Sequence, residues 1–210
     1  CASTTPQAAG VFVLPQDCTM TSAGVSLTGN LGITGDASLT TITAKTSGDR
    51  RHFNVGASKT LTLNGLKLTG GSQSSDSGGS IYVYGTGSTL HATSCVFFLN
   101  TAYGGGGVYN SDGSLLIQDS IIANNTAVYQ GGGIVQRYGT ATIIRSLISR
   151  NRQTDTGTGA NIGGGGVVIV YNAVLNVRET TIEHNRAGTN KGHQIMAVKL
   201  NSQGGAPAVT

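Results

Sequence analysis

The sequence has little charge, little proline and no long apolar run. Charged residues make up 10% of the chain, against roughly 25% in typical soluble domains. Three prolines among 210 residues suit a stack of hydrogen-bonded strands, because proline cannot donate to a strand ladder. With nine acidic residues and no Gly-Gly-x-Gly-x-Asp repeat, a calcium-binding β-roll is excluded. No apolar stretch reaches the length that spans a membrane, so we expect no membrane-spanning segment.

One eleven-residue pattern recurs five times in the middle of the chain. The copies read LTLNGLKLTGG, LHATSCVFFLN, LLIQDSIIANN, ATIIRSLISRN and LNVRETTIEHN, and they start at Leu61, Leu90, Leu115, Ala141 and Leu175. Consecutive copies start 29, 25, 26 and 34 residues apart. Self-similarity at a period of about 20 to 50 residues is the signature of a solenoid.

Each copy predicts two short strands joined by a corner. Apolar residues alternate with polar ones at period two, which is typical of a strand with one buried face, and the phase of the alternation changes in the middle of the copy. A third apolar segment follows each glycine run, for example IYVY from Ile81 and VVIVY from Val167. Three strands and three corners in about 25 residues make one coil of a parallel β-helix.

The last column of the repeat holds asparagine in four of its five copies. Asparagine tolerates the left-handed backbone conformation of a tight corner, and stacked amides can hydrogen-bond from coil to coil. We therefore predict a structural asparagine ladder formed by Asn100, Asn125, Asn151 and Asn185. The glycines at 104–107, 131–133 and 163–166 are expected to form the opposite corner, where side chains would collide. No helix pattern follows these glycines, which argues against a phosphate-binding loop.

Two recurring phrases, hydrophobic-x-x-Asn and Gly-Gly-Gly-hydrophobic, are similar to the repeats of chlamydial polymorphic membrane proteins, which carry FxxN and GGA followed by Ile, Leu or Val. Here they appear at 97–100 with 105–108, at 122–125 with 131–134, at 148–151 with 164–167, and at 182–185 with Gly192. The resemblance covers roughly residues 25–200, and it implies a right-handed parallel β-helix of the pectin-lyase-like class.

We therefore predict an all-β chain that forms a single right-handed parallel β-helix, a solenoid of about seven or eight coils. An N-terminal cap is expected over residues 1–24, the β-helix over residues 25–200 and a C-terminal tail over residues 201–210. Caps protect open sheet edges from pairing with other strands, and the C-terminal segment shows no comparable cap. The insertion at residues 153–162 is expected to protrude as a loop, and loops often carry function.

The sequence offers no catalytic constellation. Many pectin-lyase-like proteins are polysaccharide lyases, hydrolases or epimerases, whose chemistry needs carboxylates or a base beside a cationic group. The outward positions of the first strand contain no carboxylate; they are His91, Thr93, Leu116, Gln118, Thr142, Ile144, Asn176 and Arg178. Asp119, Arg145 and Glu179 share one column at the first corner, where alternating charges predict structural ion pairs. We therefore predict no catalytic residues, no metal site and no cofactor.

The three cysteines do not form a metal-binding set. Cys95 shares an inward column with Leu66, so we expect a reduced core residue. Cys1 and Cys18 would staple the N-terminal cap with a disulfide, which implies an oxidising compartment. Alternatively, Cys1 would be a lipidated residue.

The third strand predicts an exposed apolar stripe. Its outward positions hold Tyr82, Tyr84, Tyr109, Val135, Val168, Val170 and Met196, together with Arg137. Soluble monomers rarely expose a contiguous apolar stripe, and one that is exposed usually marks an interface. The alternative is that β-branched and aromatic residues simply suit the surface of a sheet.

These observations predict a non-enzymatic structural or adhesive protein of the cell surface or of an extracellular assembly. The expected partners are other proteins or further copies of the chain, bound through the apolar stripe and the open ends of the helix. A polysaccharide is a further candidate partner, and no nucleic acid is expected. The alternative functions are a carbohydrate-active enzyme and a glycan-binding module, for which Arg145 and Arg178 are candidate contacts.

Overall fold

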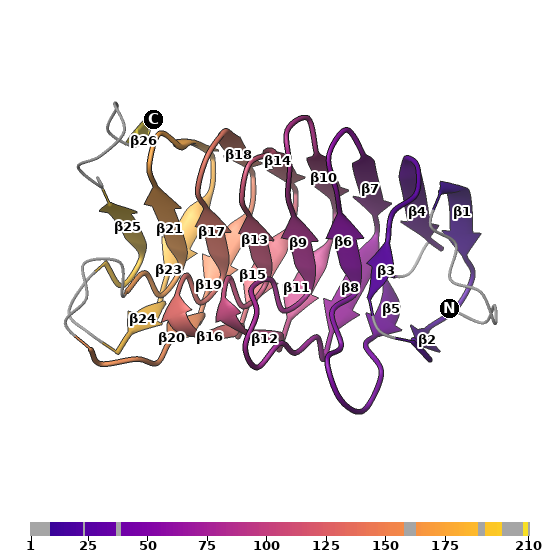
Figure 1. Cartoon of the computed structure of the whole chain (residues 1–210), viewed down its shortest axis with the longest axis horizontal. Coiled ribbons are helices and arrows are strands. Elements are labelled where there is room, and N and C mark those ends of the chain that lie inside the picture. The colour runs from indigo at the N-terminus through magenta and orange to yellow at the C-terminus, as the bar shows by residue number, and fades with distance from the viewer. Residues whose placement is uncertain are drawn as a thin grey trace.

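The strands of the chain stack in parallel, coil upon coil, and wind into a β-helix (Figure 1). The computed structural model describes residues 9–22, 24–36, 39–157, 163–188, 192–198 and 208–209. Within these ranges all regular secondary structure is β-strand. The parallel β-helix predicted from the repeat is therefore confirmed.

Three sheets run along the helix and a fourth, smaller sheet accompanies its later coils. Sheet A contains β1 (Gly10–Leu14), β4 (Leu31–Gly35), β7 (Thr60–Asn64), β10 (Thr89–Thr93), β14 (Ser114–Gln118), β18 (Thr140–Ile144), β22 (Val174–Arg178) and β26 (Ala208–Val209). Sheet B contains β2 (Cys18–Thr19), β5 (Thr40–Thr43), β8 (Leu66–Thr69), β11 (Val96–Phe98), β15 (Ile121–Ala123), β19 (Leu147–Ser149) and β23 (Thr181–Glu183). Sheet C contains β3 (Val25–Ser26), β6 (Phe53–Val55), β9 (Ile81–Val83), β13 (Val108–Asn110), β17 (Ile134–Gln136), β21 (Val167–Val170) and β25 (Ile195–Val198). Sheet D contains β12 (Thr101–Gly104), β16 (Thr126–Gln130), β20 (Arg152–Gln153) and β24 (Arg186–Ala187).

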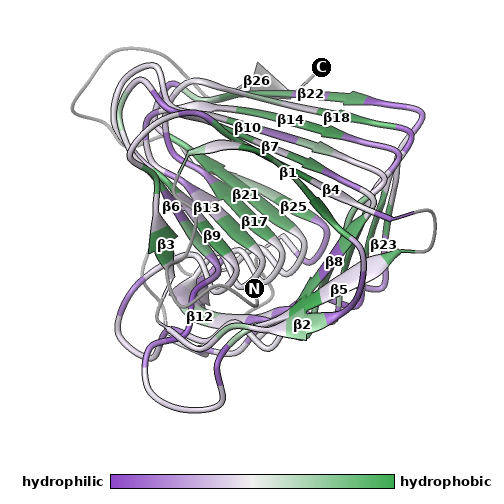
Figure 2. Ribbon diagram, turned by 90° about the vertical axis from the view of Figure 1, so that its right-hand side faces the viewer, coloured by the Kyte–Doolittle hydropathy of each residue, from purple (hydrophilic) through white to green (hydrophobic). Residues whose placement is uncertain are grey.

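The registers bring the repeated columns into line. Leu90 pairs with Leu61 on one side and with Leu115 on the other, and Ala141 continues the row to Leu175. Because side chains alternate along a strand, this register sends one apolar set inward in every coil. Viewed along the helix in Figure 2, sheet A lies at the top, sheet B at the right and sheet C at the left, with β12 below them.

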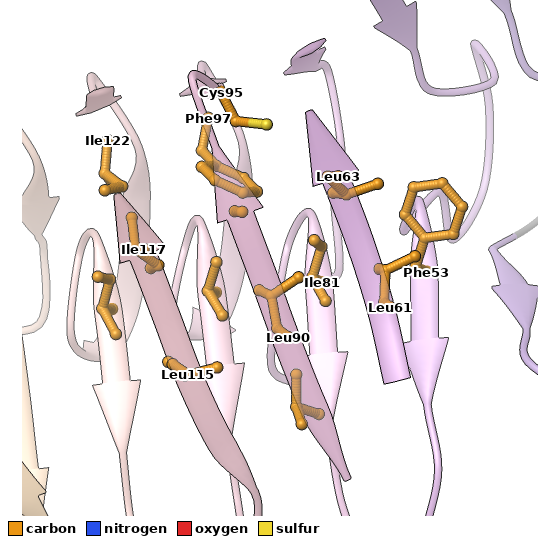
Figure 3. Packing of buried hydrophobic residues seen from close by; sticks show 14 of the residues in the cluster. Phe53, Leu61, Leu63, Ile81, Leu90, Cys95, Phe97, Leu115, Ile117 and Ile122 are labelled. Atoms are coloured by element: carbon orange, nitrogen blue, oxygen red, sulfur yellow. The ribbon is translucent and has the colours of Figure 1, made fainter. Parts of the chain in front are cut away.

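The inward set forms one continuous hydrophobic core. Leu61, Leu63, Leu90 and Ile117 have no measurable solvent exposure, and they belong to a single cluster that runs through the coils. Figure 3 shows these side chains stacked in rows between the sheets. Burying each leucine or isoleucine contributes about 1.5–3 kcal/mol, so the core accounts for the regular spacing of the repeat.

Both tight corners depend on one residue per coil in the left-handed region. At the corner between sheets A and B this residue is Ser94, Asp119, Arg145 or Glu179, with φ of 44–51°. At the corner that follows sheet B it is Leu99, Asn124, Arg150 or His184, with φ of 54–55°. The second set precedes the predicted ladder asparagines by one position. The expectation that the ladder asparagines themselves adopt the left-handed conformation is therefore wrong.

The ladder asparagines instead carry the hydrogen bonds between coils. The Nδ2 group donates to the Oδ1 atom of the next asparagine along the row, at 3.1 Å from Asn100 to Asn125, 3.0 Å from Asn125 to Asn151 and 2.9 Å from Asn151 to Asn185. Each Nδ2 also donates to a backbone carbonyl of the preceding coil, as Asn125 does to Phe97 at 2.9 Å. All four side chains are buried, so this row satisfies the backbone inside the corner.

The two ends continue the coil pattern further than expected. The predicted cap, residues 1–24, contains β1, which pairs with β4 in sheet A, and β2, which pairs with β5 in sheet B. The predicted tail, residues 201–210, contains β26, which pairs with β22. The stacking of strands is favourable enough to recruit both segments, because each added strand satisfies an otherwise open edge.

Candidate functional site

The predicted apolar stripe on sheet C is mostly buried within the chain itself. Tyr109 is 5% exposed and Val135, Val168, Val170 and Met196 are between 0% and 8% exposed. These five form a second hydrophobic cluster, separate from the main core, against which Tyr82 packs. Only Tyr84 is well exposed, at 41%. The prediction of an exposed stripe is therefore wrong for most of its members.

The cause is a backbone reversal just before each of the last five strands of sheet C, from β9 to β25. The five reversals use glycines with φ of 59–74°, and each lies four residues before a stripe position; they are Gly78, Gly105, Gly131, Gly164 and Gly192. A Cβ atom on Gly131 would lie 2.3 Å from Val135 Cγ2, and one on Gly164 would lie 1.9 Å from Val168 Cγ2. The reversing backbone thus lies directly on the outward side chains and removes them from water.

All seven tyrosines of the chain gather around this cluster. Tyr103 of β12 stacks on Tyr129 of β16, with ring centroids 5.3 Å apart and planes 6° apart. Tyr138 stacks on Tyr171 at 4.6 Å and 10°. Tyr82 contacts Tyr109 edge to face at 5.5 Å and Tyr84 at 5.2 Å. Tyr82 and Tyr109 meet because the parallel register pairs them one strand spacing apart, whereas Tyr103 and Tyr129 meet where the register of β12 and β16 shifts.

The stacked pair of Tyr103 and Tyr129, together with Tyr171 of the second pair, lines a groove of about 230 Å³. Its lining consists of Ser77, Tyr103, Gly104, Tyr109, Tyr129, Gln130, Arg137, Val170 and Tyr171. We call this feature the tyrosine groove. The ends of β12 and β16 form one wall, and the outer face of sheet C forms the other.

Arg137 is the charged member of the lining. Its Nη2 atom donates to the hydroxyl oxygen of Tyr171 at 3.1 Å, and its Cζ atom lies 5.0 Å from the centre of the Tyr171 ring. The guanidinium is also 6.0 Å from the centre of the Tyr138 ring. Burial raises the pKa of the Tyr109 hydroxyl, and the charge of Arg137 opposes that rise. The groove therefore combines phenol hydroxyl groups with one cation.

Gln130 adds an unsatisfied polar atom to the same wall. The side chain is 8% exposed, and its Oε1 atom accepts no hydrogen bond within the described part of the chain. Buried polar atoms of folded proteins nearly always have a partner. The Oε1 atom itself has almost no solvent exposure, so Gln130 contributes a buried, unpartnered acceptor to the wall of the groove.

The charged column at the first corner forms an ion pair, as predicted for its first two members. Arg145 Nε lies 2.7 Å from Asp119 Oδ1, and Arg145 Nη2 lies 2.9 Å from Asp119 Oδ2. The hydrogen bond from Arg145 holds the pKa of Asp119 below its usual range. Glu179 forms no ion pair within the described residues. Each charge of the bidentate pair is thus engaged by the other, and the pair lies apart from the tyrosine groove.

The cysteines differ in state. Cys18 is disulfide-bonded, whereas Cys95 is a free and fully buried thiol. Cys95 lies beside Phe97 in the core (Figure 3), and burial raises its pKa to about 11. The predicted partner Cys1 lies outside the described residues, as does the 158–162 part of the predicted insertion.

The sequence predicts only some of the residues that line the tyrosine groove. The strand pattern of sheet C predicts outward positions for Tyr109, Arg137 and Val170. It does not extend to Tyr103, Tyr129 and Gln130, which lie on β12 and β16. A signal was present, since Tyr103 and Tyr129 are 26 residues apart, the length of one coil. That spacing could have indicated a ring stack between coils.

No protein-family model, curated protein or solved structure matches the chain. The fold thus defines the class, a parallel β-helix. No described helix is long and apolar enough to cross a membrane. Within the described ranges, His, Cys, Asp and Glu side chains do not gather in groups of three or more that could hold a metal ion.

Proposed function

We propose that this chain is a non-enzymatic adhesive protein of the cell surface or of an extracellular assembly, and that it binds a saccharide chain in the tyrosine groove. One observation carries the proposal: four tyrosines, two of them a stacked pair, line a groove that also presents Arg137. The resemblance to surface-protein repeats agrees with it, and so does the disulfide of Cys18, since disulfides persist in oxidising compartments.

The chemistry of the lining suits a polyhydroxylated ligand. A sugar ring carries hydroxyl groups around patches of apolar C–H groups, so it needs both kinds of surface. Tyrosine supplies a rigid apolar ring with a hydroxyl that donates and accepts hydrogen bonds. Arg137 adds N–H donors beside these rings.

The size of the groove favours a polymer over an enclosed small molecule. Pockets that enclose a small molecule measure roughly 300–1,000 Å³, and the tyrosine groove is smaller, at about 230 Å³. It is suited to one unit of a chain whose neighbours lie along the surface. Sheet C, which forms one wall, is held by parallel pairing from β3 to β25, so binding requires little ordering of that wall.

The positions of the carboxylates favour binding of the saccharide without its hydrolysis. Of the two carboxylates in the charged column at the first corner, Asp119 is held by Arg145 in a bidentate pair. The groove itself has no carboxylate among its lining residues. Sugar hydrolysis usually requires two carboxyl groups that flank the bond.

A glycan array tests the proposal. We expect the wild-type chain to bind a subset of glycans and the Tyr103→Ala variant to lose most of that binding. The Tyr84→Ala variant is the matched control, because Tyr84 is as exposed as Tyr103, at 41% against 42%, but lies outside the groove lining. Equal binding by both variants would refute the groove as the site. Release of shortened sugars from any bound glycan would refute the absence of turnover.

A further inference from the structure

We infer that Arg137 forms an anion subsite in the tyrosine groove, so that the saccharide it binds carries carboxylate or sulfate groups. This inference rests on the proposed function and specifies its ligand class. Two other arginines of the chain, Arg51 and Arg145, have a defined side-chain partner.

Those arginines pair with carboxylates of the chain itself. Arg51 lies 2.7 Å from Asp76 Oδ2 and also donates to the Gly78 carbonyl at 2.8 Å. Arg145 forms the bidentate pair with Asp119. Such pairs match the fork of the guanidinium group, which presents five N–H donors in a plane.

Arg137 has no such partner in the part of the chain that the structure describes. Its side-chain contacts are the hydroxyl groups of Tyr171 and Tyr109 and the ring faces of Tyr171 and Tyr138. Two phenol oxygens use only part of a group with five N–H donors. The aromatic contacts hold the guanidinium in place without neutralising its charge.

The groove offers no internal counter-charge. Arg137 is the one charged residue among the lining residues. The carboxylate of Asp76, next to Ser77 of the lining, is already engaged by Arg51. A partly buried cation has lost some of its hydration, and an anionic ligand that accepts two parallel N–H bonds offsets that loss. The geometry of Arg137 thus selects a carboxylate or a sulfate.

A single cation also argues against a nucleic acid in the groove. Binding to a phosphate backbone is driven by several lysines and arginines that release counterions together. The groove supplies one arginine beside four tyrosines. A saccharide with spaced acidic groups matches one cation flanked by hydroxyl-bearing rings.

The test compares charged polymers with their neutral counterparts by isothermal titration calorimetry. The probes are hyaluronate and carboxyl-reduced hyaluronate, then dextran sulfate and dextran, so that carboxylate and sulfate are separate arms. The variant is Arg137→Gln, which keeps hydrogen-bond donors but removes the charge. The control is Arg150→Gln, an exposed arginine at the second corner that lies outside the groove lining. Circular dichroism establishes that both variants keep the fold.

We expect at least one acidic polymer to bind about tenfold tighter than its neutral form, and Arg137→Gln to weaken that binding by about 10- to 100-fold. Arg150→Gln should stay within about twofold of wild type, because exposed charges far from a ligand are screened. If neutral and acidic forms bind equally and Arg137→Gln matches the control, the anion subsite is refuted while the groove function stands. If no polymer binds to the wild type here or on the glycan array, the proposed function itself fails. Tighter binding of poly-glutamate than of any glycan would refute the saccharide class.

Discussion

Replacing Asn125 with alanine should destabilise the β-helix more than almost any other single truncation at a corner. Asn125 occupies the middle of the asparagine ladder and has no solvent exposure. Its Nδ2 atom donates to the Phe97 carbonyl at 2.9 Å and to Asn151 Oδ1 at 3.0 Å. Its Oδ1 atom accepts from the backbone N–H of Asn100 at 3.0 Å and from Asn100 Nδ2 at 3.1 Å.

The magnitude follows from these four hydrogen bonds. Each contributes about 1 kcal/mol net, and a buried partner left unsatisfied costs about 1–3 kcal/mol. Water cannot replace the amide easily, because the corner is closed by the coils on both sides. We therefore expect a loss of about 4 kcal/mol in the free energy of unfolding, at the upper end of what point substitutions produce.

The assay is equilibrium unfolding in urea, followed by circular dichroism. Asn124→Gly is the matched control, since Asn124 is adjacent and glycine suits its φ of 55°; this variant should change stability by less than about 0.5 kcal/mol. The slope of the transition must also be compared, because a solenoid can lose cooperativity between repeats. A loss below about 1 kcal/mol for Asn125→Ala would show that the ladder does not hold the coils together.

Three further predictions concern other buried groups. His52 is fully buried, and burial lowers its pKa to about 4 from 6.5. Because the unfolded chain binds the proton more readily, the free energy of unfolding should fall by about 3 kcal/mol as the pH drops from about 7 to 4. A His52→Gln variant whose urea midpoint falls as steeply as that of wild type over this range would contradict the assignment. Gly131→Ala should lower the free energy of unfolding by at least about 2–3 kcal/mol, because it combines a left-handed φ of 62° with a Cβ placed 2.3 Å from Val135 Cγ2. Gly32→Ala, whose Cβ would have its nearest neighbour at 3.5 Å, should lower the thermal midpoint far less, and equal effects would remove the steric argument. The Cys95 thiol, with a pKa raised to about 11 by burial, should resist iodoacetamide at pH 8 until urea unfolds the chain. Mass spectrometry that finds Cys95 alkylated after brief treatment of the native protein would contradict this prediction.

The scaffold was predictable because its cause is local and repeated. Period-two alternation in each copy sets the inward columns, and the pairing of Leu61, Leu90 and Leu115 in one register follows from their equivalent positions in the copies. The ladder row and its hydrogen bonds from coil to coil could be predicted from the recurring asparagine, but the residue that adopts the left-handed conformation could not. The left-handed position belongs to the preceding residue, such as Leu99 or Arg150, types that do not indicate this conformation in a sequence.

The candidate site was less predictable because it depends on where the backbone goes between strands. Alternation correctly placed Val135 and Val168 on the outward side of sheet C, but it could not show that the reversals at Gly131 and Gly164 fold back onto them. The same reversals bring the ends of β12 and β16 beside sheet C, which assembles the tyrosine groove from residues of several coils. Contacts across coils outside the core follow from loop paths, and loop paths leave no periodic signal.

The hydrogen bonds between the side chains of the asparagine ladder all run in one direction, and this affects how coils can be added to or removed from the chain. One N–H of every Nδ2 group points toward the following coil, from the Asn100–Asn125 contact to the last one, where Asn185 donates to Gln194 Oε1 at 2.9 Å. At the other end the row opens with the backbone N–H of Gly71 donating to Asn100 Oδ1 at 2.8 Å. Each internal rung is therefore equivalent to the next, and only the two terminal contacts are distinct. A coil can be gained or lost in whole units, for example by joining residue 114 to residue 141, because Asn100 then meets Asn151 in the geometry that Asn125 offered. Duplication of a single coil leaves the two terminal contacts of the ladder unchanged, so the ladder places no limit on the number of coils.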